Sequence, residues 1–146
     1  MSLVQGIHHI TVCASGAQED VDFLTQVFAQ RLIKQTILFD GRYAHYHLYY
    51  SNADCQPGSV YTTFPYKRVP GRPGSGQIES TAYSVPKGAV KFWVEHLDRH
   101  KVPHSGAQER FGKAFVRLSH PSGLQLEVIE DNDDTRNGWT TEKLFP

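Results

Sequence analysis

The chain has 146 residues, and its 15 lysine and arginine residues balance its 15 aspartate and glutamate residues. This length suits one domain with its own apolar core, and the zero net charge leaves no field that would attract nucleic acid or an anionic membrane. A small-molecule ligand is the better expectation. No segment has the apolar run of a signal peptide or of a membrane span, so we expect a cytoplasmic protein.

The first part of the chain predicts a strand, a helix and three more strands. The run Ile7–Ala14 is apolar and strand-like, and the residues after it recur at helical spacing. The apolar positions of that helix are Val21, Leu24, Val27 and Phe28. Three strand-like runs separated by turn-forming residues then occupy 32–39, 43–50 and 60–66. These elements make a first βαβββ module at about residues 5–67.

A segment rich in glycine, proline and basic residues, at about 68–76, predicts a linker. Its basic side chains could instead recognise an anionic substrate. The same order of elements then repeats at about 77–131. The predicted strands and helix of this second module are a strand at 78–85, a helix opening at Pro86–Gly88, and strands at 106–110, 114–119 and 125–130.

The last residues, 132–146, are acidic and turn-forming and predict a C-terminal arm with Trp139 as a candidate anchor. The repeat before them determines the architecture. We predict an α+β fold in which two βαβββ modules form curved mixed sheets. Each module alone would leave one sheet face uncovered and its edges open, so modules must pair, either within one chain or between chains.

Two adjacent histidines, His8 and His9, lie in the first predicted strand. Successive side chains of a strand point to opposite faces, so only one of the two can face the interior. An imidazole that points inward is costly unless it is hydrogen-bonded or bound to a metal. The residues alone leave both possibilities open, a hydrogen-bonded core histidine or a metal ligand.

An ordered set of short pieces runs from about residue 6 to the end of the chain: Gly6–Thr11, Tyr46–Tyr49, Pro57–Gly58 with Thr63–Pro65, Val85–Gly88, Glu109–Gly112, and Glu130–Asp131 with Asp134–Arg136. Together these pieces resemble the N-terminal half of the hydroquinone-cleaving extradiol dioxygenases. Those enzymes are members of the glyoxalase/bleomycin-resistance/dioxygenase superfamily, also called the vicinal oxygen chelate superfamily. The His-His-Ile-Thr piece alone is widespread in that superfamily, whereas the ordered set is much more specific.

The resemblance implies a metal site. Members of this family hold Fe(II) by two histidines and one carboxylate, which leaves positions for a ring hydroxyl and O2. The second histidine of the family's first-strand pair is a ligand and corresponds to His9. His8 and Thr11 would then orient the ligand, the substrate or the bound oxygen, and we predict them as catalytic residues.

One departure from the family affects the predicted metal site. In the family, the other histidine and the carboxylate come from the C-terminal half of a chain about twice this long. Within this chain the repeat aligns His9 with Ser80, and Thr62 with Glu127, so Glu127 is the second predicted metal ligand. A site of two residues would bind a divalent ion weakly and would need water or another subunit, so this polypeptide alone could be inactive.

Other polar residues are weaker candidates. His45 and His47 share a strand face with Tyr49, where they either line a cavity or simply pack. Glu79 adjoins Ser80, but strand alternation should send it to the opposite face. Three histidines on or after the second helix are expected at the surface, and one before the last strand could approach the rim of the site: His96, His100 and His104, and His120.

The leading predicted function is a ring-cleaving extradiol dioxygenase, or its N-terminal domain, that opens hydroquinone- or catechol-like aromatics with Fe(II) and O2. The alternatives are a metal-free binding protein of the bleomycin-resistance type and a glyoxalase-like isomerase. The isomerase needs a closed set of protein ligands, which Thr62 and Ser80 argue against. We expect a homodimer, or association with a second glyoxalase-like half.

Overall fold

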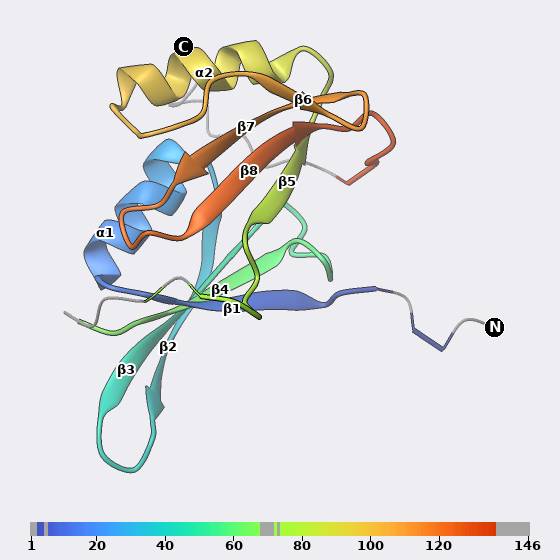
Figure 1. The fold of residues 1–146 in the computed structure, drawn as a ribbon. Helices are drawn as coiled ribbons and strands as arrows, with labels where there is room; N and C mark the ends of the chain where they lie inside the picture. Colours follow the sequence, from blue (N-terminus) through green and yellow to red (C-terminus); the bar gives the residue numbers. More distant parts are fainter. Residues whose placement is uncertain (1–2, 5, 68–71, 73, 137–146) are drawn as a thin grey trace. The chain divides into compact units, whose positions relative to one another are not determined.

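The described residues form two compact units, one within Met1–Pro70 and the other within Gly71–Arg136, which we call module one and module two (Figure 1). Part of the predicted linker and the arm from residue 137 onward, with Trp139, lie outside the described residues. The computed structural model describes residues 3–4, 6–67, 72 and 74–136.

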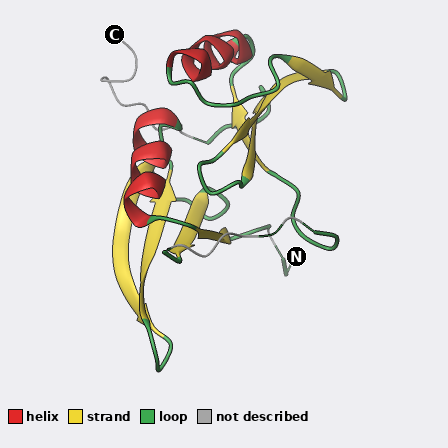
Figure 2. Cartoon of the chain, turned by 60° about the vertical axis from the view of Figure 1, so that its left-hand side comes forward, coloured by secondary structure: helices red, strands yellow, loops and turns green. Residues whose placement is uncertain are grey.

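Module one is a four-stranded mixed sheet with one helix. Its elements are β1 (His9–Ala14), α1 (Ala17–Asp22) continued by a π-helical turn η1 (Phe23–Val27), β2 (Arg31–Phe39), β3 (Ala44–Ser51) and β4 (Val60–Pro65). The strand order is β1-β4-β3-β2, with β1 parallel to β4 and the other pairs antiparallel. The β2–β3 hairpin extends beyond the end of α1 (Figure 2).

One face of this sheet packs on the helix. Leu48 and Tyr50 of β3 are almost fully buried, as is Leu24 of the helix. The buried carboxylate of Asp20 in α1 accepts hydrogen bonds from the hydroxyl of Tyr50 at 2.7 Å and from the hydroxyl of Thr63 at 2.6 Å. Burial and the neighbouring Asp20 charge raise the pKa of Tyr50, so the phenol stays protonated and donates. These two bonds tie α1 to β3 and to β4.

Module two repeats the same topology. Its elements are β5 (Thr81–Val85), α2 (Ala89–Arg99), β6 (Gln108–Arg110), β7 (Lys113–Ser119) and β8 (Gln125–Glu130). The strand order β5-β8-β7-β6 matches that of module one, and β5 is parallel to β8 as β1 is to β4. The predicted α+β fold of two βαβββ modules is confirmed.

The core of module two lies between α2 and the sheet. Leu97 of α2 and Val116 of β7 are fully buried, and Leu126 and Val128 of β8 are nearly so. The helix begins after Gly88, whose φ of 86° is in the left-handed region that favours glycine. No described helix combines the length and the apolar character that a membrane crossing needs.

Two histidines of module two differ from expectation. His96 is only 3% exposed, so the prediction of a surface histidine is wrong for this residue. It lies three residues after Trp93 on the buried face of α2, and its ring stacks on Phe92 with centroids 5.4 Å apart. His120 is buried rather than at a rim, because its Nδ1 accepts the Ser122 N–H at 3.0 Å in the turn before β8.

Replacing Asp20 by alanine should lower the free energy of unfolding by about 3 kcal/mol, because two buried hydroxyls would lose their acceptor. Urea denaturation measures this loss. Asp22→Ala is the matched control, since its contacts to Gln18 and Gln26 are exposed and its loss should stay near 0.5 kcal/mol. Equal losses in the two variants would contradict the anchoring role.

Candidate functional site

Strand alternation in module one sends a distinct set of side chains to the face away from α1, which we call the site face. Tyr50 and Thr63 point toward Asp20, so their neighbours in sequence point to the other side. The strand register places four of these site-face residues side by side across the sheet. We call them the polar row, and they are Thr11 of β1, Thr62 of β4, Tyr49 of β3 and Lys34 of β2.

His9 lies on the site face two residues before Thr11 and is exposed. The Nδ1 atoms of His8 and His9 are 3.0 Å apart, and the two rings meet edge to face. Because β1 begins at His9, His8 precedes the strand and is not bound by its alternation. The expectation that the two histidines point to opposite faces is therefore wrong, and both imidazoles lie together at the start of β1.

Thr11 and Thr62 form the first half of the polar row. The hydroxyl of Thr62 donates to that of Thr11 at 2.9 Å, and Thr62 is 1% exposed whereas Thr11 is exposed. The predicted catalytic residues thus lie on either side of His9 in the chain, His8 just before β1 and Thr11 within it. Their arrangement brings two ring nitrogens and a hydroxyl to one part of the site face.

The second half of the polar row carries aromatic rings. The hydroxyl of Tyr49 is hydrogen-bonded to Nδ1 of His47 at 2.8 Å, and the His47 ring stacks on Phe64 with centroids 3.9 Å apart and planes 24° apart. Nε2 of His47 is buried and has no hydrogen-bond partner among the described residues. Burial, and then the nearby His9 and Lys34, lower the pKa of His47, so its imidazole is neutral at pH 7.

In module two the carboxylate of Glu127 is buried in an ion-pair network. Arg110 donates to it at 2.6 Å and Arg117 at 2.7 Å, and Arg117 also reaches Glu79 at 2.9 Å. The expectation that Glu79 points to the opposite face is wrong, because β5 begins only at Thr81 and Glu79 lies before the strand. Burial acts to raise the pKa of Glu127, but the two arginines outweigh it and hold the pKa below its ordinary 4.5.

The two sheets place different chemistry at equivalent positions. The last strand of each module, β4 or β8, lies between two other strands, and one of its residues is paired with a residue on each side. The set in module one is Thr11, Thr62 and Tyr49, and the set in module two is Ala82, Glu127 and Arg117. Counting back two residues aligns His9 with Ser80, as the repeat in the sequence predicts. Charged groups in module two neutralise each other, whereas the equivalent groups of module one are neutral and polar.

The predicted metal ligands do not form a complete set. Among the residues that the structure describes, no group of three or more His, Cys, Asp or Glu side chains could hold a metal ion. His9 has an exposed imidazole and fits as one ligand. Glu127 fits less well, because both of its oxygens already accept hydrogen bonds from guanidinium groups whose positive charge would repel a cation. The two residues belong to different modules.

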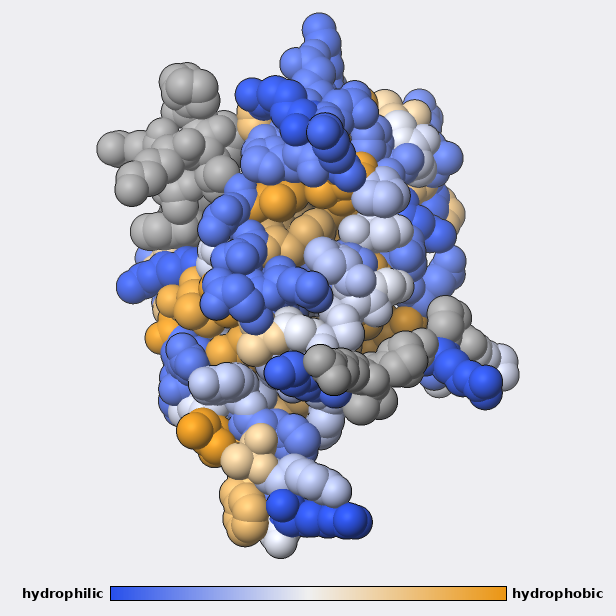
Figure 3. All heavy atoms as spheres, turned by 90° about the vertical axis from the view of Figure 1, so that its left-hand side faces the viewer, coloured by the Kyte–Doolittle hydropathy of each residue, from blue (hydrophilic) through white to orange (hydrophobic). Residues whose placement is uncertain are grey.

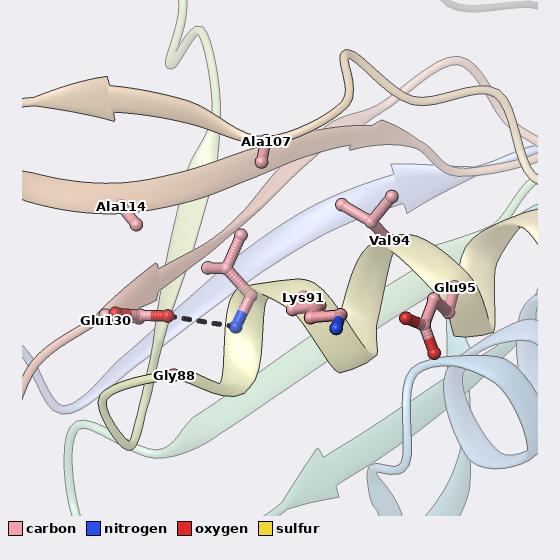
Figure 4. A pocket seen from close by; sticks show the side chains of 8 residues that line it. Gly88, Lys91, Val94, Glu95, Ala107, Ala114 and Glu130 are labelled. Atoms are coloured by element: carbon pink, nitrogen blue, oxygen red, sulfur yellow. Dashed lines mark hydrogen bonds between the residues drawn. The ribbon is translucent and has the colours of Figure 1, made fainter.

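A hollow of about 380 Å³ lies beside α2 in module two (Figure 4). Its walls are mainly apolar and include Val90, Val94 and Ala114. The carboxylate of Glu130 also borders it and accepts the Val90 N–H at 3.1 Å, which ties the start of the helix to β8. None of the predicted site residues lines this hollow.

Replacing Glu127 by glutamine should lower the free energy of unfolding at pH 7 by about 1–2 kcal/mol. The expected loss is this small because both arginines are about one-third exposed, so solvent screens their interaction with the carboxylate. The folded-state pKa is lowered, so this contribution is present above about pH 4.5 and disappears as the pH falls through the folded pKa. Urea denaturation from pH 7 to pH 3 should show the difference from wild type shrinking. Glu79→Gln, at a 77% exposed side chain, is the control and should cost about 0.5 kcal/mol or less.

No family model matches the chain. It is 42% identical over 134 residues to a chlorohydroquinone/hydroquinone 1,2-dioxygenase of Sphingobium indicum, a match that covers 90% of this chain and 42% of that protein. It is also 42% identical over 142 residues to MhqO of Bacillus subtilis, named as a ring-cleaving dioxygenase, with 97% of this chain and 45% of MhqO covered. The chain therefore spans less than half the length of these relatives.

Solved structures agree with this relationship. A Bacillus subtilis protein named as a dioxygenase superposes with a TM-score of 0.83 at 42% identity, over 92% of this chain and 43% of that one. A glyoxalase family protein of Enterococcus faecalis superposes with a TM-score of 0.71 at 17% identity, over 88% of this chain and 100% of its own, which shows likeness of fold alone. The chain thus has the glyoxalase-like, vicinal oxygen chelate fold, and it is homologous to part of the proteins named as ring-cleaving dioxygenases.

Proposed function

We propose that this chain is a domain of a ring-cleaving extradiol dioxygenase that opens hydroquinone- or catechol-like aromatics with O2. The observation that carries the proposal is the 42% identity with the Sphingobium indicum dioxygenase over 90% of the chain. Module one contributes the site face, where His8, His9 and Thr11 lie together. A divalent metal follows from this class of reaction, and we propose Fe(II).

His9 is the metal ligand that we propose for this chain. When His9 carries its proton on Nδ1 and donates it to Nδ1 of His8, its Nε2 keeps a lone pair for a metal. Ligating histidines usually donate their other ring nitrogen in this way, which fixes the tautomer and the ring orientation. His8 therefore acts by orienting His9. When bound, the metal would hold a ring hydroxyl and O2 side by side.

Thr11 is the residue that we propose to contact the substrate or O2. Its hydroxyl lies on the same face as His9, and it accepts a hydrogen bond from the buried hydroxyl of Thr62. That bond directs the proton of the Thr11 hydroxyl away from Thr62, so Thr11 can donate to an oxygen atom of the substrate or of O2. The role of this pair is orientation rather than proton transfer.

The remaining metal ligands must come from other groups. Glu127 as a ligand stays a prediction, and it requires the release of Arg110 and Arg117 from the carboxylate. We propose instead that a second glyoxalase-like half, or a second copy of the chain, completes the site, since the relatives are more than twice as long as the matched region. The isolated chain would then bind metal weakly.

The binding-protein alternative also has a supporting observation. Among the described residues there is no cluster of three metal ligands, while aromatic rings gather on the site face around His47 and Phe64. A flat ligand could stack there without any metal. No comparable observation favours the isomerase, because Thr62 stands where that chemistry would need a carboxylate.

Metal binding tests the proposal. Titration of the chain with Fe(II) under anaerobic conditions should show one weak site, and His9→Ala should weaken it by more than tenfold, with His8→Ala weakening it by about tenfold through lost orientation. His45→Ala is the matched control, because it removes a site-face histidine that pairs with Asp40 instead. Glu127→Ala should weaken Fe(II) binding only if its carboxylate is a ligand.

The same variants separate the two candidate functions. Oxygen uptake with hydroquinone or catechol, measured at saturating Fe(II), should be lost in His9→Ala. Stoichiometric iron that survives both His9→Ala and Glu127→Ala would remove the proposed metal site. A tight aromatic ligand bound without any metal would favour the binding protein.

The end of the β2–β3 hairpin is the surface that we propose for association. Ile37 and Phe39 are each 67% exposed, and Tyr43 and Tyr46 are about half exposed, so apolar atoms show at this end of the molecule (Figure 3). Isolated exposed apolar residues are ordinary, whereas a cluster of this kind marks a contact surface. The expected partner is a second copy or a second glyoxalase-like half.

Replacing Phe39 by lysine should shift the chain toward the monomer, because a charge would have to be buried in the contact. Sedimentation velocity at several concentrations measures the change, and we expect the dimer to weaken by about tenfold. Ile78→Lys is the control, since Ile78 is 74% exposed but lies in module two. An unchanged dimer in Phe39→Lys would exclude the hairpin as the contact.

A further inference from the structure

Tyr49 lies on the site face in a fixed relation to His9. In the polar row it stands opposite Thr62, which in turn stands opposite Thr11, so Tyr49 is two strands away from β1. Two strand spacings amount to about 10 Å across the sheet. A single aromatic ring with a hydroxyl at each end, bound near His9, would reach toward the Tyr49 hydroxyl.

The Tyr49 hydroxyl is held in place by His47. The hydrogen bond to Nδ1 of His47 is 2.8 Å long, and stacking on Phe64 holds the imidazole plane. In the tautomer with the proton on Nε2, Nδ1 accepts from Tyr49. The phenol oxygen of Tyr49 then keeps its lone pairs for a donor from outside the pair.

The equivalent position in module two shows that packing alone does not need this histidine. The residue two before Arg117 in β7 is Phe115, which is 6% exposed, just as His47 is two before Tyr49 in β3. A phenylalanine therefore fills this place in the same topology. The imidazole of module one adds a nitrogen that positions Tyr49, and its buried Nε2 has no partner among the described residues.

We propose that Tyr49, positioned by His47, binds a second ring hydroxyl of the aromatic substrate, while the first hydroxyl lies near His9. This proposal rests on the proposed function and deepens it. Tyr49 accepts a hydrogen bond from the distal hydroxyl, so the site prefers a ring with two hydroxyls over a ring with one. Tyr49 is thus a specificity-determining residue, and His47 is a positioning residue.

The test compares hydroquinone with phenol, which lacks the second hydroxyl. Anaerobic calorimetry on the chain at saturating Fe(II) should show hydroquinone binding five- to tenfold more tightly than phenol. Tyr49→Phe should abolish this preference by weakening hydroquinone binding to the level of phenol binding. His47→Phe, which introduces the residue found in module two, should reduce the preference. Tyr46→Phe is the matched control, because Tyr46 lies on the same strand but on the other face.

Each outcome decides between the proposals. If His9→Ala abolishes hydroquinone binding but Tyr49→Phe keeps the full preference over phenol, the role of Tyr49 is overturned and the proposed function stands. If the wild-type chain binds neither compound, the proposed function fails and the role of Tyr49 fails with it. A loss of preference in Tyr46→Phe as large as in Tyr49→Phe would also overturn the role of Tyr49, since Tyr46 lies on the other face of the sheet.

Discussion

The buried carboxylate of Asp20 is the constraint on which the site face of module one depends. It accepts the hydroxyls of Tyr50 and Thr63, and so it holds α1 against β3 and β4. Because successive side chains of a strand point to opposite faces, fixing these two residues also fixes the direction of Tyr49 and Thr62. The helix side of the sheet therefore determines which residues reach the site. The site face is thus positioned by hydrogen bonds made on the opposite face of the sheet.

The two modules show how one backbone topology carries two kinds of chemistry. Module two fills the central position with Glu127 and neutralises it with Arg110 and Arg117, so its charges are already satisfied. Module one fills the same position with Thr62, whose hydroxyl serves Thr11. Buried ion pairs contribute little to stability unless their geometry is good, and here two guanidinium groups approach one carboxylate within 3 Å. The equivalent central position thus holds a neutralised carboxylate in module two and a hydroxyl in module one.

The site face belongs to a chain that matches only part of its longer relatives. The chain spans less than half of the dioxygenases that it matches, and the described residues hold no complete set of metal ligands. His9, Thr11 and Tyr49 lie on one sheet, and we propose that a second half completes a metal centre beside them. In that arrangement module one would supply one ligand and the contacts that orient the ring. The domain boundaries, the cytoplasmic location and the metal ligands stay predictions.

The sequence by itself determined the doubled βαβββ order, the face shared by His47 and Tyr49, and the position of His9 on the first strand. These features follow from periods of 2 and 3.6 residues, which are local and visible in the chain. Only the tertiary structure decided that Arg110 and Arg117 hold Glu127, that Glu79 joins them, and that His96 is buried. Such contacts join strands far apart in sequence or depend on where a strand begins, and strand register and strand ends are set by packing rather than by local pattern. The contact between His8 and His9 is another feature that only the tertiary structure decided. It forms because β1 begins at His9, which leaves His8 outside the strand.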